Sequence, residues 1–267
     1  MVFTKIMAIG LIAFLLSCAG ARPKVGGQLH FVTIEEELRL GEEIASHSIQ
    51  HLPILRNRSI HYFLSDLARR IGQVSDWQGL QYTIFVVNAP DVNHFSLPGG
   101  NIYLFRGLLE LCSTPQEAAA VIAHEIAHLS ARDGVERLAA KYGYSLAAQQ
   151  IIGDNPEIAE HIIRSLYKPD TILDYSSAQE FAADQRAVVY LLNAGLPTDG
   201  LASLLRKIQT LQQKASPTAD LLSVTHPSAK ARLAKLKPIV KSPSASAAPF
   251  DPAAFQKMQE LLSRLPR

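Results

Sequence analysis

The sequence has little of several features that mark particular classes of protein. Only two cysteines occur among 267 residues, too few for a disulfide framework. The 26 basic and 24 acidic residues nearly balance, at a net charge of +2, so we expect no nucleic-acid partner. Beyond the first eighteen residues, no apolar run approaches the roughly 20 residues that a membrane-spanning helix needs. The 48% of hydrophobic residues is enough for a packed globular body.

The first eighteen residues, MVFTKIMAIGLIAFLLSC, have the pattern of a secretory signal peptide. Lys5 provides a positive start, and the apolar stretch Ile6–Leu16 is too short to cross a membrane. The end, Leu15-Leu16-Ser17-Cys18, resembles a bacterial lipobox, in which Cys18 is acylated after cleavage. An ordinary signal peptide with an incidental cysteine is the alternative. Because Ala19 follows, and not the aspartate typical of inner-membrane retention, we expect a lipid anchor in the outer membrane, facing the periplasm.

Composition and apolar periodicity divide the chain into four parts: a signal peptide (1–18), a tether (19–32), a main domain (33–238), and a linker with a short helical tail (239–267). A helical period of apolar residues predicts helices over 33–50, 58–74, 114–133, 177–194, 200–214, 225–236 and 253–265, with one or two more between 135 and 167. β-branched and aromatic residues predict strands over 81–88 and 101–105. The predicted fold class is therefore α+β, mainly helical with a small β-sheet.

Residues 118–130, AAAVIAHEIAHLS, contain the arrangement H-E-x-x-H on a predicted buried helix. His124 and His128 are four residues apart, so they lie on one face of a helix and can share one cation. Glu125 then stands beside that cation, where the pattern uses a glutamate as general base toward a water activated by zinc. A hydrogen-bonded cluster in an ordinary core is the alternative.

A zinc ion in a catalytic site needs a third protein ligand and one position left for water. Glu180 and Asp184 share one face of the predicted helix 177–194, far along the chain from the two histidines. Glu180 is a reasonable third ligand, and Asp184 is placed to accept the N–H of His124 and orient its ring. A solvated acidic helix face is the alternative for this pair.

Taken together, these motifs resemble the zinc metallopeptidases of family M48, and the resemblance extends from about Glu35 to Leu236. Three further elements carry it: E-E-E-L-x-L-G at Glu35–Gly41, N-H-F-S-L-P-G-G at Asn93–Gly100, and Thr225-His226-Pro227 followed by Arg232. In the second element, His94 and Ser96 stand where the family usually has alanines. The resemblance implies a mainly helical zincin fold of the gluzincin type, with a small sheet beside the H-E-x-x-H helix. It is closest to the compact periplasmic lipoprotein branch, without transmembrane helices or a tetratricopeptide domain.

The resemblance also implies how a substrate binds. An extended chain is expected to pair with the strand 101–105, and a short strand before the metal helix suits such pairing on its own physical grounds. Gly99 and Gly100 permit close backbone approach, although a plain hairpin turn is the alternative. The residues assigned to substrate binding are Pro98, Gly99, Gly100, Asn101, Ile102 and Tyr103.

His226 has several interpretations. By the resemblance it lies over the site, where it takes the fourth position on zinc in a resting state and moves away before substrate binds. Otherwise it donates a hydrogen bond to the developing oxyanion, supported by Arg232. A histidine near the start of a short helix, without a catalytic role, is the third interpretation.

The sequence therefore predicts a zinc endopeptidase, one Zn²⁺ per chain, whose substrates are misfolded or misassembled cell-envelope proteins. The alternative is a zinc-bearing chaperone or assembly lipoprotein that binds unfolded chains and rarely cuts them. Cys112 is expected to be a small buried hydrophobe. The remaining histidines lack the spacing of metal partners, namely His30, His47, His51, His61, His94 and His161.

Overall fold

The computed structural model describes residues 32–142, 175–214, 216–219, 222, 225–236 and 250–266. The predicted signal peptide with Cys18, nearly all of the tether, the part of the predicted helical region 135–167 that follows residue 142, and the linker up to residue 249 lie outside the described residues.

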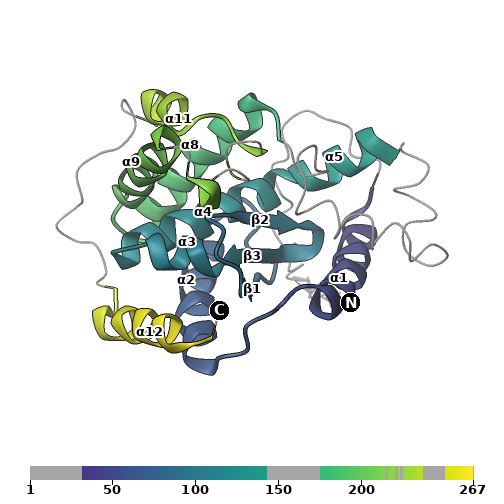
Figure 1. Ribbon diagram of the computed structural model, residues 1–267. Helices are drawn as coiled ribbons and strands as arrows, with labels where there is room; N and C mark the ends of the chain where they lie inside the picture. Colours follow the sequence, from purple (N-terminus) through teal and green to yellow (C-terminus); the bar gives the residue numbers. More distant parts are fainter. Residues whose placement is uncertain are drawn as a thin grey trace, which may run out of the picture.

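The described elements are mostly helices, with a small sheet near the middle of the molecule (Figure 1). In chain order they are α1 (Ile34–His51), α2 (Arg58–Gly72), β1 (Thr83–Val87), β2 (His94–Leu97), the 3-10 turn η1 (Pro98–Gly100), β3 (Asn101–Phe105), α3 (Arg106–Leu111), α4 (Pro115–Ala131), α5 (Asp133–Tyr142), α8 (Ser177–Asn193), α9 (Gly200–Gln213), η2 (Pro217–Ala219), α11 (Ala229–Leu236) and α12 (Pro252–Arg264). The predicted α+β class is confirmed. The short elements β2 and α3 are absent from the sequence prediction.

The sheet has three strands in the order β1-β3-β2. Strand β3 runs parallel to β1 and antiparallel to β2, so Ile102 pairs with Ile84 on one side and with Ser96 on the other. β2 escapes a search for β-branched strands because it is only HFSL, four residues that are all buried. The strand nearest to the helix α4 in sequence is thus the central one, and β2 is an edge strand in the described part of the chain.

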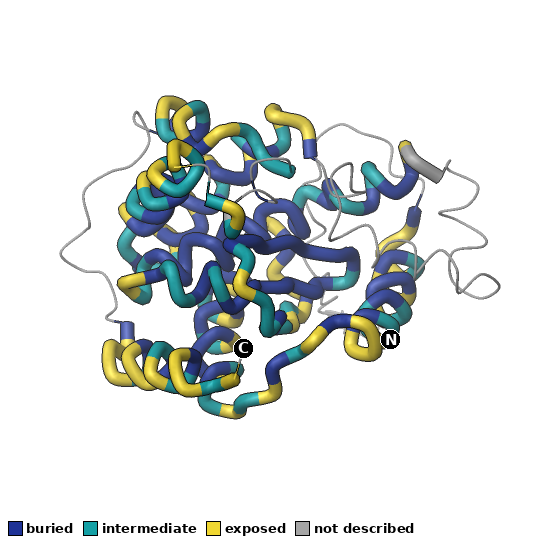
Figure 2. The backbone as a smooth tube through the Cα atoms, viewed as in Figure 1, coloured by how far each residue is buried: buried dark blue, intermediate teal, exposed yellow. Residues whose placement is uncertain are grey.

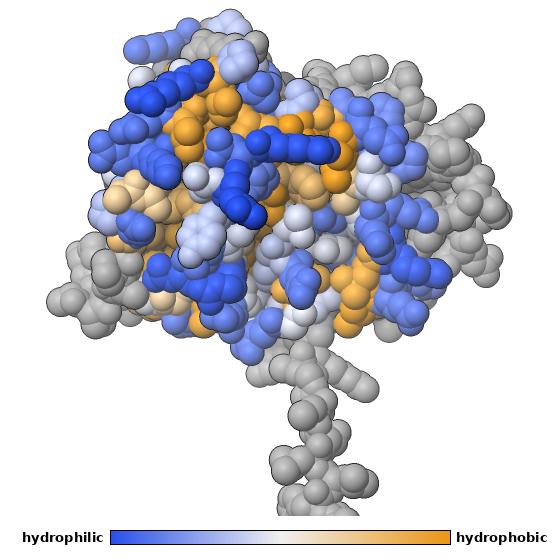
Figure 3. Space-filling view, turned by 90° about the horizontal axis from the view of Figure 1, so that it is seen from below, coloured by the Kyte–Doolittle hydropathy of each residue, from blue (hydrophilic) through white to orange (hydrophobic). Residues whose placement is uncertain are grey.

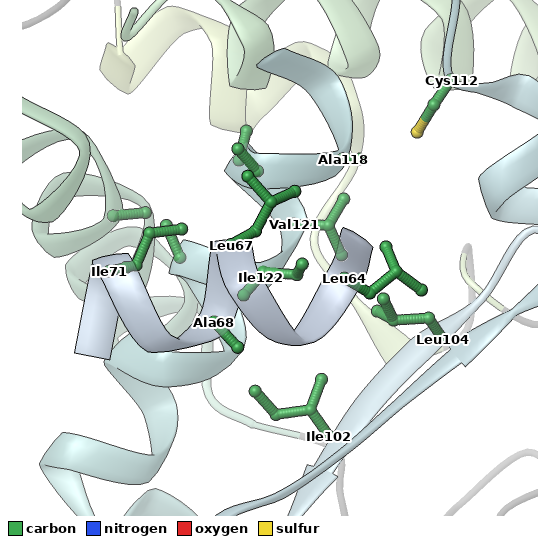
Figure 4. Close-up of a cluster of buried hydrophobic side chains, with 14 of the residues drawn as sticks. Leu64, Leu67, Ala68, Ile71, Ile102, Leu104, Cys112, Ala118, Val121 and Ile122 are labelled. Atoms are coloured by element: carbon green, nitrogen blue, oxygen red, sulfur yellow. The ribbon is translucent and has the colours of Figure 1, made fainter. Parts of the chain in front are cut away.

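Helix α4 occupies the centre of the fold, and almost all of its length is buried (Figure 2). Its first half is rich in alanine, and these small side chains let α2, α8 and α9 pack closely around it. Figure 4 shows how Leu64 and Leu67 of α2 face Val121 and Ile122 of α4 in this core. From Glu117 to Ser130 the helix is buried on every side, so His124, Glu125 and His128 are buried with the apolar residues around them.

The tail helix α12 lies against α2 and α3 (Figure 1). Its buried residues Phe255, Met258 and Leu262 join the same hydrophobic core as α4. The buried side chain of Arg106, at the start of α3, donates to the carbonyls of Leu262 at 2.6 Å and Pro266 at 2.9 Å. These bonds satisfy carbonyls that the end of a helix would otherwise leave unpaired.

Helix α1 is held against the turn η1 by close backbone contact. Gly99 has a positive φ of 79° and its backbone approaches Gly41 of α1 without an intervening side chain. Asn101 bridges the two segments, because its side-chain amide donates to the carbonyls of Gly41 and Pro98, at 3.0 Å each. This junction connects α1 to the strands β2 and β3 on either side of the turn.

The underside of the molecule carries hydrophobic residues between hydrophilic ones (Figure 3). An open groove of about 1140 Å³ lies between α1 and β1, lined in part by Leu38, Ile49 and Phe85. Among the described helices, none has both the length and the hydropathy needed to cross a membrane.

We expect the substitution Gly41→Ala to destabilise the protein by about 1–3 kcal/mol, because the contact is already fully packed. An added Cβ would lie 2.6 Å from the Cα of Gly99 and would also overlap the carbonyl oxygen of Pro98. The matched control is Gly79→Ala, whose Cβ would meet no atom within 4 Å. Urea unfolding of both variants measures the difference, and equal stability of the two would contradict the close contact.

Candidate metal centre and active site

Helices α4 and α8 bring His124, His128 and Glu180 together at one buried point. The Nε2 atoms of the two histidines are 3.1 Å apart. Glu180 completes the triangle, with Oε1 at 3.4 Å from Nε2 of His128 and Oε2 at 3.6 Å from Nε2 of His124. All three side chains are at most 1% exposed. The helical period places the two histidines on one face, and the packing of α8 against α4 supplies the carboxylate.

The outer nitrogen of each histidine is held by a carboxylate. His124 Nδ1 lies 3.0 Å from Oδ1 of Asp184, and His128 Nδ1 lies 2.7 Å from Oδ2 of Asp133. Because an ionised carboxylate only accepts hydrogen bonds, the two rings donate from Nδ1. Their Nε2 lone pairs then face the same point as Glu180. This is the arrangement in which outer-layer carboxylates orient metal-binding histidines.

The three inner groups fit a divalent cation. Both carboxylate oxygens of Glu180 are buried without a hydrogen-bond partner in the described structure, so they are available to a cation. With zinc–ligand bonds of about 2.0–2.2 Å, two corners of a tetrahedron lie about 3.3–3.6 Å apart. The three observed separations, 3.1, 3.4 and 3.6 Å, are close to that value.

The protonation of the centre is set by burial and by its neighbours. Burial raises the pKa of Glu180, but the nearby His128 and Arg232 hold it well below its ordinary value. Burial lowers the pKa of His128, whereas its hydrogen bond to Asp133 and the nearby carboxylate of Glu180 raise it more, to about 10. Because a metal binds only the neutral ring, a cation at this centre competes with a proton for Nε2 of His128.

Arg232, on α11, lies behind the centre. Its guanidinium donates to both carboxylate oxygens of Asp184, at 2.9 and 2.6 Å, and its Nη1 is 3.7 Å from Oε2 of Glu180. Burial raises the pKa of Asp184, but this charge pair outweighs it and holds that pKa well below the ordinary value. Arg232 thus positions Asp184, and through it His124, from a place in the outer layer of the centre.

Glu125 lies on α4 beside the metal triangle and has one oxygen free. Its Oε1 is hydrogen-bonded to Nδ1 of His94, which comes from β2. Its Oε2 is buried and has no hydrogen-bond partner in the described structure. Burial raises the pKa of Glu125, but the charge and hydrogen bond of His94 lower it to about 2. The free oxygen is therefore an ionised proton acceptor.

His226 lies next to the same centre, just before α11. Its Nε2 is 3.7 Å from Oε1 of Glu180, and its Nδ1 is 2.8 Å from the hydroxyl oxygen of Thr225. The ring is also close to two other imidazoles, with ring centres 5.0 Å from His94 and 6.4 Å from His124. Burial lowers the pKa of His226 to about 3, so the ring is neutral and can bind a cation.

Three residues of the site were absent from the sequence prediction: His94, Asp133 and Tyr175. Asp133 follows α4 directly, after Arg132 turns the chain with a left-handed φ of 60°. Tyr175 stacks on the ring of His128, with centres 4.1 Å apart. For His94 the sequence did contain a signal, a histidine where the family pattern has alanine. For Asp133 and Tyr175 it contained none that spacing alone could identify.

The predicted substrate strand needs a correction. Residues 101–105 form β3, whose two edges are already paired with β1 and β2, so the expectation that Asn101, Ile102 and Tyr103 offer a free edge is wrong. Pro98–Gly100 form the turn η1 against α1. In the described part of the chain, β2 is the strand that has one unpaired edge and also contributes a side chain to the site.

Comparisons with known proteins agree with this geometry. The model of peptidase family M48 matches residues 54–240. The mitochondrial metalloendopeptidase OMA1 of Schizosaccharomyces pombe is 28% identical over 179 residues, which cover 66% of this chain and 51% of that protein. Its namesake in Arabidopsis thaliana is 30% identical over 167 residues, covering 59% and 31%.

A bacterial relative, the beta-barrel assembly-enhancing protease of Yersinia pestis, is 21% identical over 217 residues. That alignment covers 76% of this chain and 43% of the relative. The matched segment thus spans about half or less of the length of these curated relatives.

We expect Asp133→Asn to weaken the affinity for Zn²⁺ by about 10–100-fold, because the amide orients His128 less firmly than the carboxylate does. Competition with a chromophoric chelator measures this affinity. The control, Asp66→Asn, removes a carboxylate that pairs with Arg69 on the surface and should leave the affinity unchanged. An unaltered affinity in Asp133→Asn would mean that Asp133 does not support the metal centre.

Proposed function

This chain belongs to peptidase family M48, and on that premise we propose that it is a zinc-dependent endopeptidase that hydrolyses peptide bonds. The observation that carries the proposal is the joint geometry of His124, His128 and Glu180 with the free oxygen of Glu125 beside them. Two imidazoles and one carboxylate are a ligand set typical of catalytic zinc, because they leave a position for the reacting groups.

Each residue around the centre has a separate role in the proposed hydrolysis. When bound, zinc supplies Lewis-acid chemistry, polarising a peptide carbonyl and making water more acidic. Glu125 accepts the proton of the attacking water at Oε2 and passes it to the leaving amine nitrogen. His94 holds the other oxygen of Glu125, so the carboxylate presents one defined face. Asp184 and Asp133 keep the two imidazoles in the orientation that binds the metal.

The substrate is proposed to lie extended along the unpaired edge of β2, as an added strand. Two observations support this position. His94 of β2 contacts Glu125, so the edge is next to the proton acceptor. Asn93, immediately before β2, has a buried Oδ1 without a hydrogen-bond partner in the described structure, which can accept an N–H of a bound peptide.

His226 is proposed to control access to this edge. Its neutral ring and its distance of 3.7 Å from Glu180 suit a fourth ligand in a resting state. In this state the position needed by water is occupied, so His226 must move away before the reaction. The alternative function depends on the same residue. If His226 stayed on the metal permanently, water could not bind and the protein would act as a metal-containing chaperone.

The cellular setting is proposed from the N-terminal sequence and the bacterial relative. The lipobox-like sequence before Cys18 suits a lipid anchor in the outer membrane, and the name of the Yersinia relative refers to the assembly of β-barrels. We therefore propose a lipid-anchored enzyme of the bacterial cell envelope that faces the periplasm. Its substrates would be misfolded or misassembled envelope proteins, which expose extended segments that can pair with β2.

We expect Glu125→Gln to reduce cleavage of denatured casein by at least about 100-fold while the zinc content stays at one per chain. The amide keeps the volume of the side chain but cannot accept the proton. The matched control is Glu260→Gln on the exposed face of α12, which should cleave like the wild type. Gel-based cleavage assays and metal analysis of the same preparations provide the two readouts.

Full cleavage by Glu125→Gln would rule out Glu125 as the proton acceptor. If the wild type binds zinc and does not cleave, but both proteins protect denatured casein from aggregation equally, the chaperone function is the correct one.

We expect Cys18→Ser to move the protein from the membrane fraction to the soluble fraction, because the serine cannot carry the thioether-linked lipid. Fractionation of bacterial cells and mass spectrometry of the N-terminal peptide measure this. Cys112→Ser is the control, since Cys112 is buried in the domain core. A wild-type N-terminal peptide without acyl chains would contradict the proposed anchor.

A further inference from the structure

Four histidines surround the centre, and each has its outer ring nitrogen engaged. Nδ1 of His124 and His128 contacts a carboxylate, Nδ1 of His226 contacts the hydroxyl of Thr225, and Nδ1 of His94 contacts Oε1 of Glu125. In each ring Nε2 is therefore the nitrogen that remains for a metal. Metal-binding histidines generally have their second ring nitrogen held in this way. His94 shares this feature with the two histidines of the H-E-x-x-H helix, because a carboxylate holds its Nδ1 as well.

The position of His94 brings it within reach of the same ion. Its ring centre is 5.5 Å from that of His124, at nearly a right angle, and 5.0 Å from that of His226. One nitrogen of each of these three histidines lies within 4.8 Å of the other two. Two nitrogens on one zinc ion are at most about 4.2 Å apart, so a shift of under about 1 Å would bring all three into one coordination shell.

A role limited to holding Glu125 does not account for the whole environment of His94. Such a role explains the contact at Nδ1, on the side of the ring toward α4. It does not explain why the rest of the ring packs among two other imidazoles in a buried position. Imidazoles gathered in this way are a ligand set for borderline divalent metals such as Zn²⁺ and Co²⁺.

We propose that His94 is a further metal-binding residue of this chain, forming with His124 and His226 a second triad that shares His124 with the first. His124 belongs to both triads and has only Nε2 available, so both triads must bind the same ion. His94 binds this ion through Nε2, while Glu125 holds its Nδ1. Glu125 would then be the orienting carboxylate of a metal-bound histidine. The proposal rests on the proposed zinc function but concerns a ligand that the family pattern, with alanine at this position, does not contain.

The test compares metal binding by four forms of the full chain: wild type, His94→Ala, His94→Asn and His51→Ala. The probes are Zn²⁺ affinity, by competition with a chelator, and the visible absorption spectrum of the Co²⁺-substituted protein. His94→Asn is the decisive variant, because its amide can still donate to Glu125 from the position of Nδ1 but has no atom at Nε2. His51 on α1 is exposed and stacks on the half-buried His47, with ring centres 6.4 Å apart, so it controls for binding at the surface.

We expect both His94 variants to bind Zn²⁺ at least about tenfold more weakly than the wild type and to share an altered Co²⁺ spectrum. His51→Ala should match the wild type in both measurements. A wild-type affinity and spectrum in His94→Ala would overturn the inference, and so would a wild-type result in His94→Asn alone, since His94 would then act only through Glu125.

The outcome also separates this inference from the proposed function. If the wild type and both His94 variants bind one zinc ion equally well, the metallopeptidase stands and the additional ligand is wrong. If the wild type binds no zinc, both are wrong.

Discussion

Two imidazole nitrogens and a carboxylate face one another within a few ångströms in the interior of the protein. A cation bound between them would stabilise this arrangement. His124 and His128 present their Nε2 atoms 3.1 Å apart because Asp184 and Asp133 hold the opposite sides of the rings. Burying these groups costs free energy unless each is paired. The alanine-rich helix α4 and its tight packing against α8 therefore bring together groups that a bound metal stabilises.

The outer layer of the centre ties it to distant parts of the chain. Arg232 of α11 holds Asp184 of α8, and Asp184 in turn orients His124 of α4. At the other end of α4, Arg132 donates to Glu37 of α1 at 2.5 Å and to the carbonyl of Val32 at 2.7 Å. The same left-handed turn at Arg132 brings Asp133 back to His128. The contacts that hold these helices together are thus also the contacts that orient the two histidines.

The opposite side of the centre is built from segments that a substrate would have to approach. β2 contributes His94 and an unpaired edge, and the segment before α11 contributes His226. Glu125 lies between them with one oxygen engaged and one free. In the proposed reaction these residues decide whether water and peptide reach the metal, whereas the carboxylates behind His124 and His128 decide how firmly the metal is held.

Features that depend on local spacing could be predicted from the order of residues alone. A helical period puts His124, Glu125 and His128 on one turn, Glu180 and Asp184 share a face for the same reason, and the strand 101–105 follows from its own composition. Tertiary structure alone decided which strand keeps a free edge, because strand pairing is a contact between segments and β2 was too short to predict. It also decided that His94, Asp133 and Tyr175 join the centre. These residues meet through a sheet edge, a left-handed turn and ring stacking, and none of these leaves a periodic signal in the chain.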